Sequence, residues 1–107
     1  MMKPVHTLED IHAAIRENPL VLLYISRNEC SVCHGLLPQV EDMLKEFPGV
    51  VPVHAKADEI PAVAGEFSIF TVPVVLVFVK GRELLRKARF VPIGELREQL
   101  RKIIDHI

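Results

Sequence analysis

The heptapeptide Asn28-Glu29-Cys30-Ser31-Val32-Cys33-His34 carries the strongest structural signal in this sequence. It follows the apolar run Leu20 to Ile25 and opens a segment of helical periodicity that reaches Phe47, so we expect both thiols at a corner between a strand and a helix. A helix start offers unpaired N–H groups and the positive end of the helix dipole. Such positions lower the pKa of a cysteine from about 8.5 to roughly 3.5–7.5. Cys33 lies one helical turn after Cys30 and can close a disulfide with it.

Length and composition describe one ordinary domain. With 107 residues, of which 50% are hydrophobic and 25% charged, the chain is expected to form a single domain over residues 1–107. No apolar run has the length of a signal peptide or a membrane span, so we expect a cytoplasmic protein without membrane contact. A formal net charge of −1 argues against nucleic-acid binding. Two cysteines in a C-x-x-C spacing indicate redox or metal chemistry.

Hydrophobic periodicity predicts helices before, between and after the strands. The capping-box-like Thr7-Leu8-Glu9-Asp10 opens an amphipathic helix, and Leu20–Ile25 is apolar on both faces, as in a central strand. A helix joins that strand to a second one over Val50–Ala57, which makes the two strands parallel. Asp58 is expected to cap a short helix that has Pro61 in an early position.

The second half predicts a hairpin and a closing helix. Val72–Val79 and Glu83–Val91 flank the turn Lys80-Gly81, and apolar residues repeat at helical intervals from Ile93 to Ile107. The complete pattern predicts an α/β fold, a three-layer sandwich in which helices flank a central mixed sheet of about four strands.

With these elements placed, the chain resembles the thioredoxin family over essentially its whole length. Cys30-Ser31-Val32-Cys33 follows a buried strand, Pro38 falls where family members kink the active-site helix, and Thr71-Val72-Pro73 occupies the position of their cis-proline loop. The resemblance implies a thiol-disulfide oxidoreductase that acts on protein disulfides in cell redox homeostasis. It assigns Cys30 as the nucleophile and Cys33 as the resolving thiol.

The same resemblance implies how the substrate and the electrons arrive. The backbone beside Pro73 would hold the substrate strand, next to the apolar surface of Val32, Thr71 and Val72. Electrons would come from a flavoprotein of the thioredoxin-reductase type. The chain itself is expected to bind no cofactor.

Several positions depart from the family pattern. Glu29 stands where thioredoxins usually carry a tryptophan, and a carboxylate that faced the Cys30 sulfur would raise the pKa of that thiol. Tyr24 stands where thioredoxins bury an acid, and His54 where a lysine usually lies. We interpret His34 or His54 as a partial replacement for this proton relay, since histidine titrates near neutral pH. For His54 the preferred interpretation is a packed strand residue whose ring is hydrogen-bonded.

Other functions use the same residues. Thr71-Val72-Pro73 is also the tripeptide with which glutaredoxins grip glutathione, although their Gly-Gly-x-Asp is replaced here by Lys80-Gly81-Arg82-Glu83. A binding module with little turnover would use the surface of Val32, Thr71 and Val72 for docking. Cys30 to His34 matches the haem-attachment pattern C-x-x-C-H, which the missing signal sequence disfavours. A metal bound by Cys30, Cys33 and His34 would lack a fourth ligand, so we expect none.

The outer strand of the hairpin is basic. Lys80, Arg82, Arg86, Lys87 and Arg89 are interpreted as charges that protect an exposed sheet edge from pairing. Arg89 also stands where thioredoxins carry a glycine beside the substrate groove. It would either narrow that groove or recruit an acidic substrate.

Overall fold

Strand β2 (Leu20–Ser26) lies at the centre of the protein, whose computed structural model describes all residues from 1 to 107. Every residue of β2 is buried, and its side chains alternate between two hydrophobic cores. One core receives Leu20, Leu22 and Tyr24, and the other receives Val21, Leu23 and Ile25. Both faces of this strand are covered, which explains its continuous apolar sequence.

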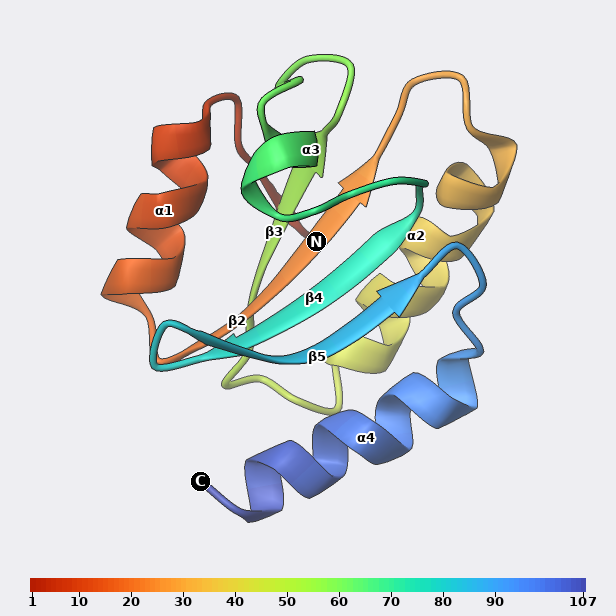
Figure 1. Cartoon of the computed structure of the whole chain (residues 1–107). Coiled ribbons are helices and arrows are strands. Elements are labelled where there is room, and N and C mark those ends of the chain that lie inside the picture. The colour runs from red at the N-terminus through yellow and green to blue at the C-terminus, as the bar shows by residue number, and fades with distance from the viewer.

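The sheet contains five strands in the order β1-β3-β2-β4-β5 (Figure 1). Besides β2 they are β1 (Lys3–Pro4), β3 (Val51–Lys56), β4 (Val74–Val79) and β5 (Arg82–Ala88). β3 runs parallel to β1 and β2, whereas β4 is antiparallel to β2 and β5. The sheet has one strand more than the about four that were predicted, because β1 has two residues and is too short to show an alternating pattern.

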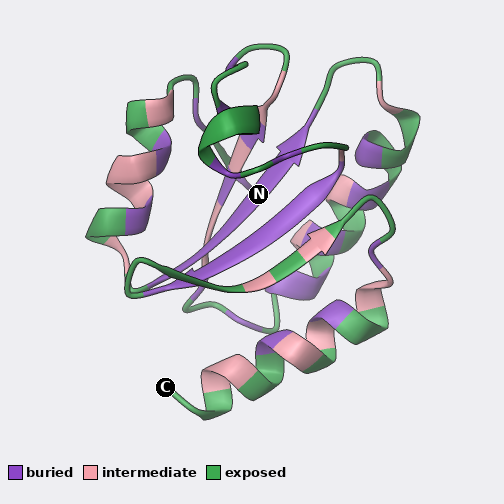
Figure 2. Ribbon diagram, in the orientation of Figure 1, coloured by how far each residue is buried: buried purple, intermediate pink, exposed green.

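Two pairs of helices cover the sheet (Figure 1). α1 (Leu8–Glu17) and α3 (Val63–Glu66) lie on one face, and α2 (Ser31–Leu44) and α4 (Ile93–Asp105) on the other. The buried sides of these helices face the sheet (Figure 2). This arrangement confirms the predicted three-layer α/β sandwich. None of the helices combines the length and the apolar surface needed to cross a membrane.

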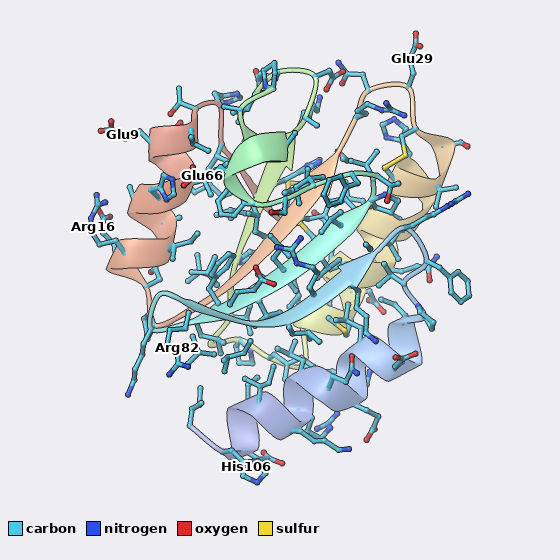
Figure 3. The ribbon with its side chains drawn as sticks, viewed as in Figure 1. Glu9, Arg16, Glu29, Glu66, Arg82 and His106 are labelled. Carbon is cyan, nitrogen blue, oxygen red and sulfur yellow. A yellow bond between two sulfur atoms is a disulfide. The ribbon has the colours of Figure 1, made fainter.

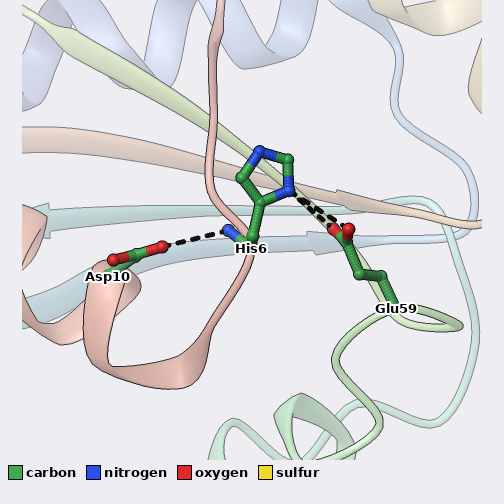
Figure 4. Close-up of polar contacts among 3 residues, drawn as sticks. All are labelled: His6, Asp10 and Glu59. Atoms are coloured by element: carbon green, nitrogen blue, oxygen red, sulfur yellow. Dashed lines mark hydrogen bonds and ion pairs between the residues drawn. The ribbon is translucent and has the colours of Figure 1, made fainter.

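The start of α1 contains the predicted cap. The Asp10 N–H donates to the Thr7 hydroxyl at 3.0 Å. In a capping box the side chain at this position would accept the backbone N–H of the cap residue Thr7. Here the Asp10 carboxylate instead accepts the N–H of His6, one residue earlier, at 3.2 Å (Figure 4). His6 also contacts Glu59, with 3.1 Å between its Nδ1 and the carboxylate. These contacts tie the segment before α1 to the turn that follows β3.

Asp58 does not cap α3, contrary to the prediction. Residues 57–59 form a separate turn, in which the Lys56 carbonyl accepts the N–H of Ile60 at 2.9 Å, and α3 begins only at Val63. The Asp58 carboxylate instead accepts the N–H of Asn28 at 3.2 Å. It therefore connects the end of β3 to the loop that precedes Cys30.

The β4–β5 hairpin turns at Lys80 and Gly81, as predicted. Both residues have positive φ (51° and 83°), which matches the twist of the flanking strands. β5 ends at Ala88, earlier than the predicted Val91, because Arg89 has a φ of 67°, outside the range of strand residues.

Candidate active site

The two cysteines occupy the corner between β2 and α2. Cys30 is the N-cap residue of α2, with extended backbone angles, and its Sγ accepts the N–H of Cys33 at 3.2 Å. The two residues form a disulfide, with 5.3 Å between their Cα atoms. Cys33 is 1% exposed, whereas Cys30 is partly exposed. The Cys30 sulfur thus lies at a helix start, where N–H groups and the helix dipole favour negative charge.

Two hydrogen bonds hold the loop before Cys30. His34 Nε2 donates to the Asn28 carbonyl at 2.6 Å, and the Asn28 N–H donates to Asp58 at 3.2 Å. The Glu29 side chain points away from the fold (Figure 3). Its carboxylate therefore does not face the sulfur, the orientation that would have opposed a thiolate.

Tyr24 lies beneath the first turn of α2. It is fully buried, and its hydroxyl donates to the Cys33 carbonyl at 2.5 Å. Burial raises the pKa of Tyr24 to about 12. The phenol therefore keeps its proton at neutral pH and acts as a fixed hydrogen-bond donor that ties β2 to α2.

His54 is paired with Tyr24 across the parallel strands β3 and β2. The two rings meet edge to face with 5.3 Å between their centroids, and His54 Nε2 lies 2.6 Å from the Ser26 hydroxyl. Burial lowers the pKa of His54, with smaller contributions from Lys56 and His34, and Glu41 acts in the opposite direction. Neither His34 nor His54 is hydrogen-bonded to a cysteine sulfur.

The segment Thr71–Pro73 leads into β4 at the edge of the sheet where β2 ends and the chain passes into α2. The Val72–Pro73 peptide bond is cis. Val74 is paired with Ile25 near the end of β2 and with Ala88 at the end of β5, and Figure 1 shows this loop beside the start of α2. The N–H of Arg89 donates to the Pro73 carbonyl at 2.6 Å. Three predicted site segments, around Cys30, Pro73 and Arg89, thus meet at one edge.

A groove of about 440 Å³ lies at this edge, which we call the Arg27–Arg89 groove. The residues that line it include Arg27, Ala57, Phe70, Thr71, Val72 and Arg89. Phe70 is 92% exposed, and Arg27 and Phe70 were not among the predicted site residues. In the sequence, only the position of Phe70 directly before Thr71 could have indicated that it lies beside the substrate-binding loop. A larger hollow of about 740 Å³ is mostly polar and lies at the opposite end of the sheet, beside the turn at Lys80 and Gly81.

No group of three or more His, Cys, Asp or Glu side chains is arranged to hold a metal ion. The corner itself carries two sulfurs that can exchange disulfides. They are joined at a helix start, one partly exposed and the other buried.

The family model described as Thioredoxin matches residues 3–105. The chain belongs to the thioredoxin family. It is 43% identical over 102 residues to the thioredoxin-like protein YdfQ of Bacillus subtilis, covering 95% of this chain and 91% of that protein. It is 29% identical to thioredoxin 1 of Chlorobaculum tepidum, covering 92% and 96% of the two chains. The crystal structure of Trypanosoma brucei brucei thioredoxin has a TM-score of 0.89 at 22% identity, covering 98% of this chain and 92% of that one.

Family membership and the cysteine pair agree on the activity. The protein is a thiol-disulfide oxidoreductase with a thioredoxin fold, and members of this family act on protein disulfides. Within the family pattern, the buried Tyr24 replaces an acid with a group that cannot accept a proton at neutral pH. His54, which stands at the position of a lysine, is paired with Tyr24 on the neighbouring strand and contacts its ring.

Replacing Arg89 with glycine should raise the free energy of unfolding by about 1 kcal/mol. A left-handed backbone costs a residue with a Cβ roughly 1–2 kcal/mol, and glycine does not incur this cost. Denaturant unfolding followed by circular dichroism measures the change. Arg89→Ala is the matched control, because alanine removes the charge but keeps the Cβ. An equal gain in both variants would show that the backbone angle is not the cause.

Lowering the pH below about 6.5 should reduce the free energy of unfolding, and His54→Asn should remove part of this dependence. Burial lowers the pKa of His54 in the folded protein, so the unfolded chain takes up the proton first and is favoured as the pH falls. Urea unfolding at a series of pH values gives the slope. His106→Asn, in an exposed residue after α4, should keep the wild-type slope. A wild-type slope in His54→Asn would contradict the assignment.

Proposed function

We propose that Cys30 attacks protein disulfides and that Cys33 resolves the resulting intermediate. The observation that carries this assignment is the difference in exposure: Cys30 is partly exposed at the start of α2, and Cys33 is 1% exposed beneath it. A substrate sulfur can approach the first residue, whereas the second is accessible mainly to its neighbour. The helix start favours the thiolate form of Cys30.

The exchange conserves atoms and electrons. In the reduced protein the Cys30 thiolate attacks one sulfur of a substrate disulfide, and the other substrate sulfur leaves as a thiolate that takes up a proton. The Cys33 thiol then loses its proton and attacks the Cys30 sulfur, which breaks the mixed disulfide and releases the second substrate thiolate. Two electrons have passed to the substrate, and the Cys30–Cys33 disulfide remains.

We assign substrate binding to Val32, Thr71, Val72 and Pro73. Val32 is 61% exposed in the first turn of α2, two residues after Cys30. Thr71 and Val72 line the Arg27–Arg89 groove, and their backbone groups form no hydrogen bond within the fold. An extended substrate segment could pair with this backbone while its disulfide faces Cys30.

The cycle requires a donor that returns two electrons to the disulfide. We propose a flavoprotein of the thioredoxin-reductase type as this partner, as family membership supports. A compartment that keeps thiols reduced suits such a cycle, so we propose the cytoplasm as its location. The scheme involves no nucleic acid, membrane, metal or bound cofactor.

For proton transfer we propose that His34 or His54 partly replaces the acid found in other family members. His34 lies in the first turn of α2, next to Cys33, and His54 contacts Tyr24 beneath that turn. An imidazole ring has a nitrogen that can take up and release a proton, whereas the Tyr24 phenol keeps its proton.

Cys33→Ser should trap a protein substrate such as insulin as a mixed disulfide with Cys30, and Cys30→Ser should not. The resolving step is missing in the first variant, whereas the second lacks the attacking thiol. Non-reducing electrophoresis and mass spectrometry detect the adduct. Both variants should lose the acceleration of insulin reduction by dithiothreitol that the wild type provides.

The opposite trapping pattern would reverse the two roles. If the fully reduced wild type gives no acceleration, the protein is a binding module with little turnover. A comparison of glutathione with thioredoxin reductase as electron donor separates the glutaredoxin-like activity from the proposed one.

His34→Ala or His54→Ala should move the pH midpoint of Cys30 alkylation upward, because the variant loses a group that takes the thiol proton or stabilises the thiolate. Alkylation by iodoacetamide across a pH series measures the midpoint. His106→Ala serves as the control and should match the wild type. Unchanged midpoints in both active-site variants would rule out the relay.

A further inference from the structure

Two arginines of the Arg27–Arg89 groove have no acidic partner. Arg16, Arg86, Arg97 and Arg101 each lie within 4 Å of a glutamate carboxylate. Arg27 and Arg89 form no such ion pair, and no aspartate or glutamate lines the groove. Arg27 also borders a second hollow, of about 490 Å³, together with Glu29 and Asp58, but it forms an ion pair with neither carboxylate. Two guanidinium groups are therefore available to an external anion.

Strand order places the two arginines on either side of the substrate-binding loop. Arg27 follows the end of β2, Val72 and Pro73 precede β4, and Arg89 follows the end of β5. These strands are adjacent in the order β2-β4-β5. Neighbouring strands are about 4.8 Å apart, so the two backbones are separated by roughly 10 Å with the loop between them. A peptide that crosses the loop would pass between the two charges.

The backbone at Arg89 points to a use for its side chain. Its φ of 67° is unfavourable for a residue with a Cβ, and its N–H is held by the Pro73 carbonyl. Such backbone conformations persist mainly where the surrounding structure enforces them, and they cluster at binding and catalytic sites.

The rest of the groove is suited to a peptide. Val72, Ala57 and the exposed ring of Phe70 provide apolar contacts. The backbone N–H and carbonyl groups of Thr71 and Val72 are unpaired, so an extended segment can form main-chain hydrogen bonds with them. A small inorganic anion would use the arginines but neither of these features.

We propose that Arg27 and Arg89 select protein disulfides whose cysteine is flanked by aspartate or glutamate. This inference rests on the proposed exchange at Cys30 and adds the class of substrate. The formal net charge of the chain is −1, so an acidic substrate is not attracted by the protein as a whole. The preference must come from charges placed locally beside the groove.

The test compares two synthetic peptides, each closed by one disulfide, that differ only in having Glu or Gln beside the cysteines. At low ionic strength the wild type should have a kcat/KM about fourfold higher for the Glu peptide, the product of two exposed charge pairs of roughly twofold each. High salt should reduce this preference, because exposed charges are screened.

Arginine variants assign the preference to these side chains. Arg27→Gln and Arg89→Gln should each lower it, and the double variant should abolish it, so that the Glu and Gln peptides are reduced with equal kcat/KM. Arg82→Gln is the matched control, since Arg82 has no acidic partner and lies at the other end of β5. It should retain the wild-type preference.

The outcomes distinguish a failure of the proposed substrate selection from a failure of the disulfide exchange at Cys30 on which it rests. No reduction of either peptide would overturn the exchange at Cys30. Equal rates for the two peptides, or an equal loss of preference in Arg82→Gln, would overturn the selection by Arg27 and Arg89 while the exchange stands. A third substrate, the Gln peptide joined to glutathione by a mixed disulfide, tests the alternative ligand. If its kcat/KM exceeds that of the Glu peptide, the groove binds the carboxylates of glutathione, and the peptide assignment is wrong.

Discussion

The burial of β2 on both faces is the constraint from which the rest of the molecule follows. Its side chains enter two separate cores, so the chain must supply helices on both sides of the sheet. The helix that follows β2 must cross to one of these faces, and this requirement creates the corner where Cys30 lies. The same strand carries Tyr24, whose hydroxyl fixes the first turn of α2 through the Cys33 carbonyl. The seven residues of β2 therefore both organise the two cores and position the helix that carries the cysteines.

Much of this organisation could be predicted from residue patterns. The continuous apolar runs of β2 and β4, the glycine turn at Gly81 and the cysteine spacing at the start of α2 are local signals, and each led to the observed element. The fold class and the placement of the thiols depended on these signals alone.

The missed features depend on contacts between distant segments. β1 exists only because Lys3 and Pro4 pair with β3. Asp58 has the residue type of a helix cap, but its carboxylate is used by Asn28, thirty residues earlier in the sequence. The groove that joins Arg27, Phe70 and Arg89 combines three loops, and no pattern within any one of them indicates that they meet. Sequence periodicity reports which face of an element is buried, but not which side chains share a cavity.

The position of Tyr24 also has a spectroscopic consequence. The chain has no tryptophan and a single tyrosine, so its tyrosine fluorescence arises from one side chain. That side chain is fully buried and hydrogen-bonded to the backbone of Cys33. The emission of the protein is therefore a built-in optical reporter for the first turn of the helix that carries the thiols. No label has to be introduced to follow changes there.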